Sequence, residues 1–239
     1  MTVPPLPVRI HGDALIVFVK EPRPGVVKTR LAAALGHEVA AQVYRVLAEE
    51  EIRRTAPRGD EYTRLFFHAP AEAGAAMADW LPGEILVPQS EGDLGARMSA
   101  AFADVFARGA RRAAIIGTDV PAMDRATVME ALESLDVHDL ALGPTPDGGY
   151  YLLALDRPRP ELFRGMAWST PAVLMATAER AGALGLSVRM LPPLPDIDTI
   201  DDLRAEWPRL QGLFEPTGLA PILALALETG PLKRERIQE

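Results

Sequence analysis

The stretch that most constrains the fold of this 239-residue chain is AAIIGTDVP, at residues 113–121. Four small or branched apolar residues lead directly into Gly117 and Thr118, a pattern typical of a buried strand at the centre of a parallel sheet. Pro121 cannot continue a strand and favours extended backbone in the residue before it. Asp119 is therefore predicted at the carboxyl end of a strand, where open α/β sheets bind ligands. Capping of the next helix is the alternative role for Asp119.

A basic loop, KEPRPGVVKTRLA at residues 20–32, follows the first apolar run of the chain, ALIVFV at residues 14–19. Its prolines and glycine exclude helix until about residue 27. Cations at a helix N-terminus oppose the helix dipole, and a bound phosphate would resolve that conflict. The cations predicted to hold phosphate are Lys20, Arg23, Lys28 and Arg30. The spacing is not that of a Walker P-loop, and a solvated basic loop is the alternative.

A second glycine-containing segment, QSEGDLGARM at residues 89–98, comes between a short strand and a helix. Glycine at a strand end allows close approach of the backbone to a ligand. Gln89, Asp93 and Arg97 are the candidate contacts to the ribose, base or diphosphate of a nucleotide. Helix capping explains Asp93 equally well.

Two further turns carry aspartates after later strands. In GPTPDGG, residues 143–149, Asp147 is expected to face the cleft, while Gly148 and Gly149 leave space over a substrate beside Tyr150. The Asp-Gly pair also predicts a β-hairpin. In the segment DIDTIDD, residues 196–202, the first two aspartates occupy alternate positions of an extended segment, so Asp196 and Asp198 face the same way.

Apolar runs alternate with amphipathic segments along the chain, which predicts an α/β fold with a mostly parallel sheet. The expected strands are 14–19, 62–68, 85–87, 113–116, 139–142, 150–155 and 186–191. The expected helices are 37–54, 71–80, 94–108, 124–135, 171–183 and one beginning near 201, with Ser169 or Thr170 as the N-cap of the helix at 171. The predicted organisation is a single domain at residues 13–211, a flexible lead-in at 1–12, and a C-terminal helix and disordered tail at 212–239.

Composition limits the partners of this chain. The net charge of −8 argues against a general nucleic-acid-binding surface. The absence of cysteine excludes disulfides, thiolate metal sites and a cysteine nucleophile. No signal peptide or membrane-spanning stretch is apparent, so a cytoplasmic protein is expected, while its oligomeric state stays open.

The aspartates and the basic loop are predicted to share one edge of the sheet. Clustered carboxylates repel one another, and burying them unpaired is costly. A bound Mg²⁺ or Mn²⁺ resolves this, because these ions take oxygen ligands and share them with substrate phosphates. The sequence therefore predicts a site for a nucleotide diphosphate or triphosphate.

Six ordered motifs carry a family resemblance: FVKEPRPGVVKTRLA, QSEGDLGARM, IIGTDVP, LGPTPDGGYYLLAL, LFRGMAWST and DIDTIDDL. Over residues 14–205 the chain resembles bacterial arsenosugar-biosynthesis-type glycosyltransferases. That family is similar in fold to nucleotide-diphospho-sugar transferases and to molybdopterin and phospholactate guanylyltransferases. The resemblance implies a GT-A-type, three-layer α/β/α sandwich, a nucleotide-bearing donor and a divalent metal. It implies that the first loop, with Arg23, Gly25, Lys28 and Arg30, holds the phosphates. It places Asp119 as the metal-binding acid and matches Asp198 to the aspartate before the last core helix.

The first loop lacks the paired glycines of the guanylyltransferases, and Asp119 stands in GTDVP rather than in the Asp-x-Asp of typical glycosyltransferases. Three functions follow as hypotheses. The first is glycosyl transfer from a nucleoside-diphosphate sugar to a small acceptor, with Asp147 or Asp198 as general base and Asp119 with Asp198 at the metal. The second is nucleotidyl transfer from an NTP, which releases pyrophosphate. The third is a nucleotide-binding module without catalysis.

Overall fold

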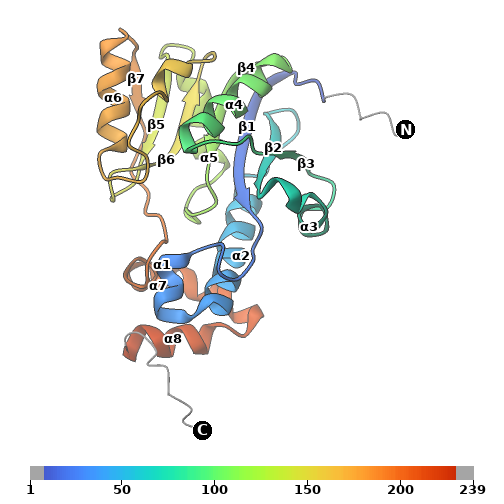
Figure 1. Ribbon diagram of the computed structural model, residues 1–239, viewed down its shortest axis with the longest axis vertical. Coiled ribbons are helices and arrows are strands. Elements are labelled where there is room, and N and C mark those ends of the chain that lie inside the picture. The colour runs from blue at the N-terminus through green and yellow to red at the C-terminus, as the bar shows by residue number, and fades with distance from the viewer. Residues whose placement is uncertain (1–7, 230–239) are drawn as a thin grey trace.

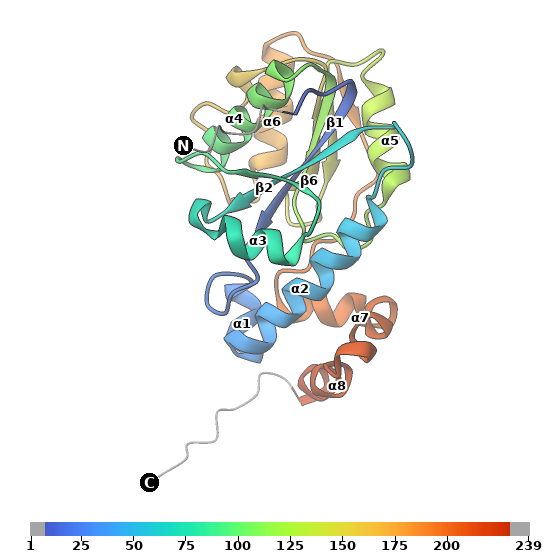
Figure 2. The ribbon, with the colours of Figure 1, turned by 90° about the vertical axis from the view of Figure 1, so that its right-hand side faces the viewer.

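The computed structural model describes residues 8–229, and it contains one seven-stranded sheet with helices on both faces (Figures 1 and 2). The first part of the expected lead-in, residues 1–7, and the end of the expected tail, residues 230–239, lie outside the described residues. The strands are β1 (Gly12–Lys20), β2 (Thr63–Ala69), β3 (Ile85–Pro88), β4 (Ala110–Ile116), β5 (Leu140–Pro144), β6 (Tyr150–Leu155) and β7 (Val188–Met190). The α-helices are α1 (Thr29–Leu35), α2 (His37–Arg54), α3 (Gly74–Trp80), α4 (Leu94–Ala107), α5 (Arg125–Ser134), α6 (Val173–Ala183), α7 (Ile200–Phe214) and α8 (Ala220–Thr229).

The sheet has the strand order β3-β2-β1-β4-β6-β5-β7. β4 is in the middle, which confirms the central position predicted for the apolar run before Asp119. Within residues 8–229, β6 alone runs against its neighbours β4 and β5, and the other pairs are parallel. The hairpin predicted from the Asp147-Gly148 pair forms between β5 and β6. The carboxyl ends of β1, β4 and β5 therefore lie at the same edge of the sheet.

Two apolar layers cover the faces of the sheet. Alternation along β1 sends Leu15 and Val17 into the layer formed with α3 and α5, and Ile16 into the layer formed with α4 and α6. All three side chains are fully buried. Full burial of such a side chain stabilises the fold by about 1.5–3 kcal/mol.

A third apolar cluster joins α1, α2, α7 and α8 beyond the edge where β1 ends (Figure 2). Leu47 of α2, Leu203 of α7 and Leu223 of α8 are fully buried in it. This cluster holds the helices that follow the basic loop against the helix that follows Asp198. α7 continues to Phe214, so the predicted domain end at residue 211 falls inside a helix. Within residues 8–229, no helix is both long and apolar enough to span a lipid bilayer.

Short polar side chains begin several helices. Asp124 accepts a hydrogen bond from the Thr127 amide at 3.0 Å at the start of α5. Thr199 and Asp202 form a reciprocal capping box at the start of α7. The prediction that Ser169 or Thr170 caps the helix at residue 171 is wrong.

α6 begins two residues later than predicted, at Val173, with Ala172 at its N-cap. Ser169 has a φ of 61°, so the chain turns there instead of entering the helix. The Thr170 hydroxyl donates to the carbonyl of Ala167 at 2.8 Å.

Candidate nucleotide and metal site

A cavity of about 480 Å³ opens at the carboxyl ends of β1 and β4. These two parallel strands pair as far as Val17 and Ile116 and then separate into the loops that carry the predicted residues. Of those residues, the cavity is lined by Lys20, Lys28, Arg30, Gln89, Arg97, Asp119, Tyr150 and Asp198. The fold therefore brings together residues from five separate parts of the chain.

Lys28 lines the cavity beside two carboxylates. It stands immediately before α1 in the left-handed backbone region, with φ 47°. Its side chain is only 3% exposed, and its ammonium group donates to Oδ1 of Asp119 and, at 2.9 Å, to Oδ1 of Asp198. Arg30 lies 3.6 Å from the other oxygen of Asp198. The basic loop thus contacts both predicted metal-binding carboxylates.

At Lys28 and Asp198, the neighbouring opposite charges and hydrogen bonds together shift the pKa more than burial does. Burial alone would lower the pKa of Lys28, but the carboxylates of Asp119 and Asp198 raise it above its usual value. Burial likewise opposes ionisation of Asp198, whereas the ammonium of Lys28, its hydrogen bond and the charge of Arg30 lower the pKa of that carboxyl. Lys28 is therefore held as a cation and Asp198 as an anion.

Asp119 and Asp198 converge on a single cation position, because both contact the same ammonium group. Their side chains remain 47% and 38% exposed, so both can also reach a ligand in the cavity. Among residues 8–229, no three acidic, histidine or cysteine side chains form a group that could hold a metal. Mg²⁺ is commonly bound through one or two carboxylates together with substrate phosphates. The donor pair therefore fits a divalent metal that shares its coordination with a phosphate.

The opposite side of the cavity is formed by the segment after β3. Gln89 donates its amide to the carbonyl of Phe67 at 2.7 Å and accepts from Arg97 at 3.1 Å, which fixes both side chains at the cavity wall. Asp93 does not line the cavity. Its carboxylate accepts from the Ala96 amide at 2.8 Å and caps α4, which is the alternative role considered for it.

The remaining predicted residues lie outside the cavity lining. Asp147 forms a tight turn in which its Oδ1 accepts from the Thr145 hydroxyl at 2.5 Å and from the Gly149 amide at 3.0 Å. Gly148 packs directly against the backbone of the 171 region. Arg23 is exposed, with its guanidinium 3.7 Å from Glu21, and neither it nor Gly25 lines the cavity.

Asp196, which shares its extended segment with Asp198, is in a different environment. Burial raises its pKa to about 6, and the nearby charge of Asp147 adds to that shift. The two alternate aspartates thus differ: Lys28 and Arg30 contact Asp198, whereas carboxylates surround Asp196.

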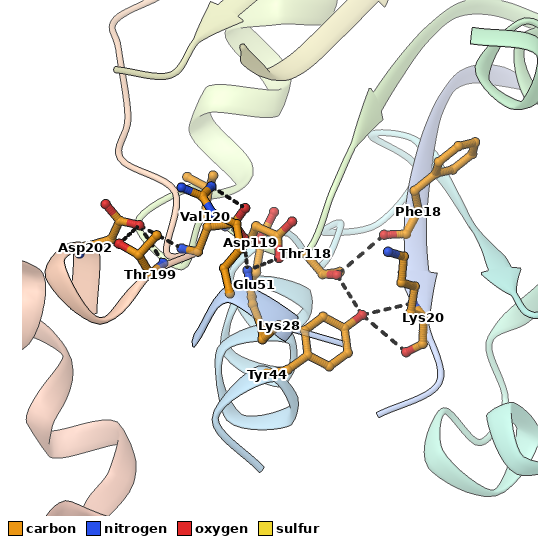
Figure 3. A network of polar contacts seen from close by, with 12 residues as sticks. Phe18, Lys20, Lys28, Tyr44, Glu51, Thr118, Asp119, Val120, Thr199 and Asp202 are labelled. Atoms are coloured by element: carbon orange, nitrogen blue, oxygen red, sulfur yellow. Dashed lines mark hydrogen bonds and ion pairs between the residues drawn. The ribbon is translucent and has the colours of Figure 1, made fainter. Parts of the chain in front are cut away.

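The sequence reasoning missed a buried polar network beneath the cavity (Figure 3). The Tyr44 hydroxyl accepts from the Lys20 amide at 2.9 Å and lies 3.0 Å from the Thr118 hydroxyl. About two turns further along α2, the Glu51 carboxyl accepts from the Val120 amide at 2.8 Å. A tyrosine and a glutamate on the buried face of an amphipathic helix were the available signal.

The fold is that of the nucleotide-diphospho-sugar transferases. A crystal structure of a protein from Desulfovibrio desulfuricans G20, provisionally named as such a transferase, is 30% identical with a TM-score of 0.82. The alignment covers 90% of this chain and 96% of that protein. The model of the family DUF2064, described as uncharacterized proteins conserved in bacteria, matches residues 52–170. Over that segment the chain is similar to the DUF2064 family.

Two more distant structures share the fold. The 4-diphosphocytidyl-2C-methyl-D-erythritol synthase of Anaerococcus prevotii DSM 20548 is 10% identical with a TM-score of 0.54, over 83% of this chain and 98% of that one. The inositol-1-phosphate CTP transferase of T. maritima is 13% identical with a TM-score of 0.50, over 85% and 96% of the chains. At these identities the likeness establishes the fold alone. A search of curated proteins gives no match, and the narrower arsenosugar resemblance stays a prediction.

Proposed function

We propose that the protein is a metal-dependent glycosyltransferase that moves a sugar from a nucleoside-diphosphate sugar to a small acceptor. One observation carries the proposal: Lys28, Asp119 and Asp198 meet inside a cavity at the carboxyl ends of β1 and β4. A cation and two carboxylates around one point match the needs of a diphosphate with its divalent metal. The 30% identical structure with a transferase name supports the same class.

The basic residues have a direct role in this reaction. Lys28 is held as a cation by its carboxylate partners, and Arg30 lies beside it with its side chain 66% exposed. Both can donate charge-assisted hydrogen bonds to the departing diphosphate. A divalent metal on Asp119 and Asp198 would act as a Lewis acid toward the same phosphate oxygens. Lys20 extends the positive rim of the cavity.

The acceptor is proposed to enter from the side of β6, where Tyr150 lines the cavity. Asp198 has a lowered pKa and two cationic partners, so it suits metal binding better than proton abstraction. Asp147 remains the proposed general base, a role that requires it to reach the acceptor from the β5–β6 turn, outside the cavity lining. It adjoins Gly148 and Gly149, which give the turn its shape.

Nucleotidyl transfer is the second candidate, because four cationic side chains line the cavity and could serve a triphosphate: Lys20, Lys28, Arg30 and Arg97. In that reaction an NTP is attacked at its α-phosphorus and pyrophosphate leaves. The two reactions are separated by their products. Incubation with nucleoside-diphosphate sugars or with NTPs, each with Mn²⁺ and candidate acceptors, should release a nucleoside diphosphate in the first case and pyrophosphate in the second.

The proposal predicts that the nucleoside diphosphate is released by the parent protein and by Arg189→Met. Asp119→Asn should abolish this release. Arg189 pairs with Glu130 on the exposed surface, away from the cavity, and controls for the loss of a charged side chain. Pyrophosphate release would instead establish the second candidate. If neither product is released with any combination of donor and acceptor, both candidate functions are contradicted.

A further inference from the structure

The buried face of α2 connects the two strand ends that carry the candidate site. Tyr44 and Glu51 are seven residues apart, so they project from nearly the same side of the helix, about two turns from one another. Tyr44 is 3% exposed and Glu51 is 1% exposed. Their polar atoms contact backbone or hydroxyl groups of Lys20, the last residue of β1, and of the segment that follows β4 (Figure 3).

Tyr44 links the two strands where they separate. Its hydroxyl accepts from the Lys20 amide at 2.9 Å, lies 3.2 Å from the Lys20 carbonyl, and lies 3.0 Å from the Thr118 hydroxyl. Thr118 in turn lies 3.5 Å from the carbonyl of Phe18. A single buried hydroxyl therefore fixes the end of β1, where the basic loop begins, relative to the residue before Asp119.

Glu51 fixes the other side of Asp119. The Val120 amide donates to its carboxyl at 2.8 Å, and this is the backbone group directly after Asp119. On the next turn of α2, Arg54 donates to the carbonyls of Met123 and Ala122 at 3.0 and 3.2 Å. The loop that carries Asp119 is thus held along its length by one helix.

We propose that Tyr44 and Glu51 are positioning residues, which hold the ends of β1 and β4 at a fixed separation. In this arrangement the basic loop that carries Lys28 and the loop that carries Asp119 bind the same metal-bound phosphate. The proposal rests on the proposed function for the identity of that ligand. Tyr44 reaches the lining of the cavity, whereas Glu51 lies outside it, and neither contacts Lys28, Asp119 or Asp198 by a hydrogen bond. Tyr44 acts through Lys20 and Thr118, and Glu51 acts through the backbone of Val120.

The test uses two readouts on the full-length protein. The first is amide hydrogen exchange at Lys20 and Val120, which reports the two strand ends without any ligand. The second is calorimetric binding of inorganic pyrophosphate with Mn²⁺, the chemistry that a sugar-nucleotide and an NTP share. The variants are Tyr44→Phe, Glu51→Leu and Glu51→Gln.

Tyr62→Phe is the matched control, because Tyr62 is 4% exposed and donates its hydroxyl to the Thr55 carbonyl at 2.7 Å, at the far end of α2. Like Tyr44→Phe, it removes one buried tyrosine hydroxyl, but the hydrogen bond that it loses does not reach the site. Thermal unfolding of all four variants establishes a temperature at which each is folded.

Loss of the Tyr44 hydroxyl or of the Glu51 acceptor should weaken Mn²⁺-pyrophosphate binding by at least about threefold to tenfold, the effect of one hydrogen bond, in Tyr44→Phe and Glu51→Leu. Exchange should accelerate at Lys20 in the first variant and at Val120 in the second. Glu51→Gln keeps an acceptor for the Val120 amide and should restore both readouts. Tyr62→Phe should bind like the parent protein.

Equal weakening in Tyr62→Phe, or parent-like exchange and binding in Tyr44→Phe and Glu51→Leu, would overturn the positioning role. If the parent protein itself fails to bind Mn²⁺-pyrophosphate, the proposed function is overturned instead. In that case the exchange rates at Lys20 and Val120 still decide whether Tyr44 and Glu51 hold the strand ends.

Discussion

The Nζ atom of Lys28 lies 2.9 Å from Oδ1 of Asp198, although the two residues are 170 positions apart in the chain. The same ammonium contacts Asp119, which follows the central strand. This contact joins the loop after β1 to the segment before α7. It also means that a divalent metal between the two carboxylates must compete with a lysine already held there.

Replacing Lys28 with methionine should therefore have opposite effects on two ligands. Mn²⁺ alone should bind more tightly, because no ammonium competes for Asp119 and Asp198. Relative to the affinity for Mn²⁺ alone, the affinity for pyrophosphate with Mn²⁺ should fall about tenfold to a hundredfold, because the charge-assisted hydrogen bond from Lys28 is lost. Calorimetric titration of both ligands measures the difference, with Arg189→Met as the control. Parallel changes for the two ligands would argue against the shared site.

The buried carboxyl of Glu51 predicts a pH dependence of stability. Burial raises its pKa well above the usual value of 4.5, so the folded protein binds this proton more tightly than the unfolded chain does. Its contribution to the free energy of unfolding therefore falls as the pH rises above 4.5 toward the folded-state pKa. Glutamine has no such proton. The melting temperature of Glu51→Gln should increase relative to that of the parent protein between pH 4 and pH 8, and a constant difference would contradict this.

Gly148 should be far less tolerant of alanine than Gly165. Both have positive φ, 90° and 60°, but a Cβ at Gly148 would overlap the backbone of Pro171, whereas nothing lies within 4 Å of one at Gly165. The conformational penalty common to both is about 1–2 kcal/mol, and steric overlap adds about 1–3 kcal/mol at Gly148. Urea denaturation of Gly148→Ala and Gly165→Ala compares the two. Equal losses would show that the segment at 164–172 is not packed on the β5–β6 turn.

Much of the sheet and part of the site could be predicted, because strand ends leave a clear sequence pattern. Lys28, Asp119 and Asp198 each follow a strand or precede a helix, so sequence position alone placed them at one edge. Their direct contact could not be predicted, because it depends on how α1 and α7 pack together. Tyr44 and Glu51 were missed because the α2 pattern shows which face is buried without showing what that face meets.

The predicted role of Asp147 as general base can be separated from its role in the turn. Asp147→Asn keeps an oxygen that can accept from the Gly149 amide and the Thr145 hydroxyl, so the turn should persist. Removal of the base should lower kcat about 10²-fold to 10⁴-fold while leaving the KM for the donor nearly unchanged. Steady-state kinetics at pH 7 measures both constants. A parent-like kcat would exclude Asp147 as the base.

The most direct test of the central claim is thermal unfolding of the parent protein and of Asp119→Asn against nucleoside-diphosphate sugars, nucleoside diphosphates and NTPs, each with and without Mn²⁺. A ligand at a hundred times its Kd stabilises the folded state by about 2.7 kcal/mol, which for a chain of this size corresponds to roughly 5–10 °C. The account predicts a Mn²⁺-dependent rise of that size with one nucleotide sugar, greater than with the matching NTP and lost in Asp119→Asn. No rise with any nucleotide, or an equal rise in Asp119→Asn, would contradict it.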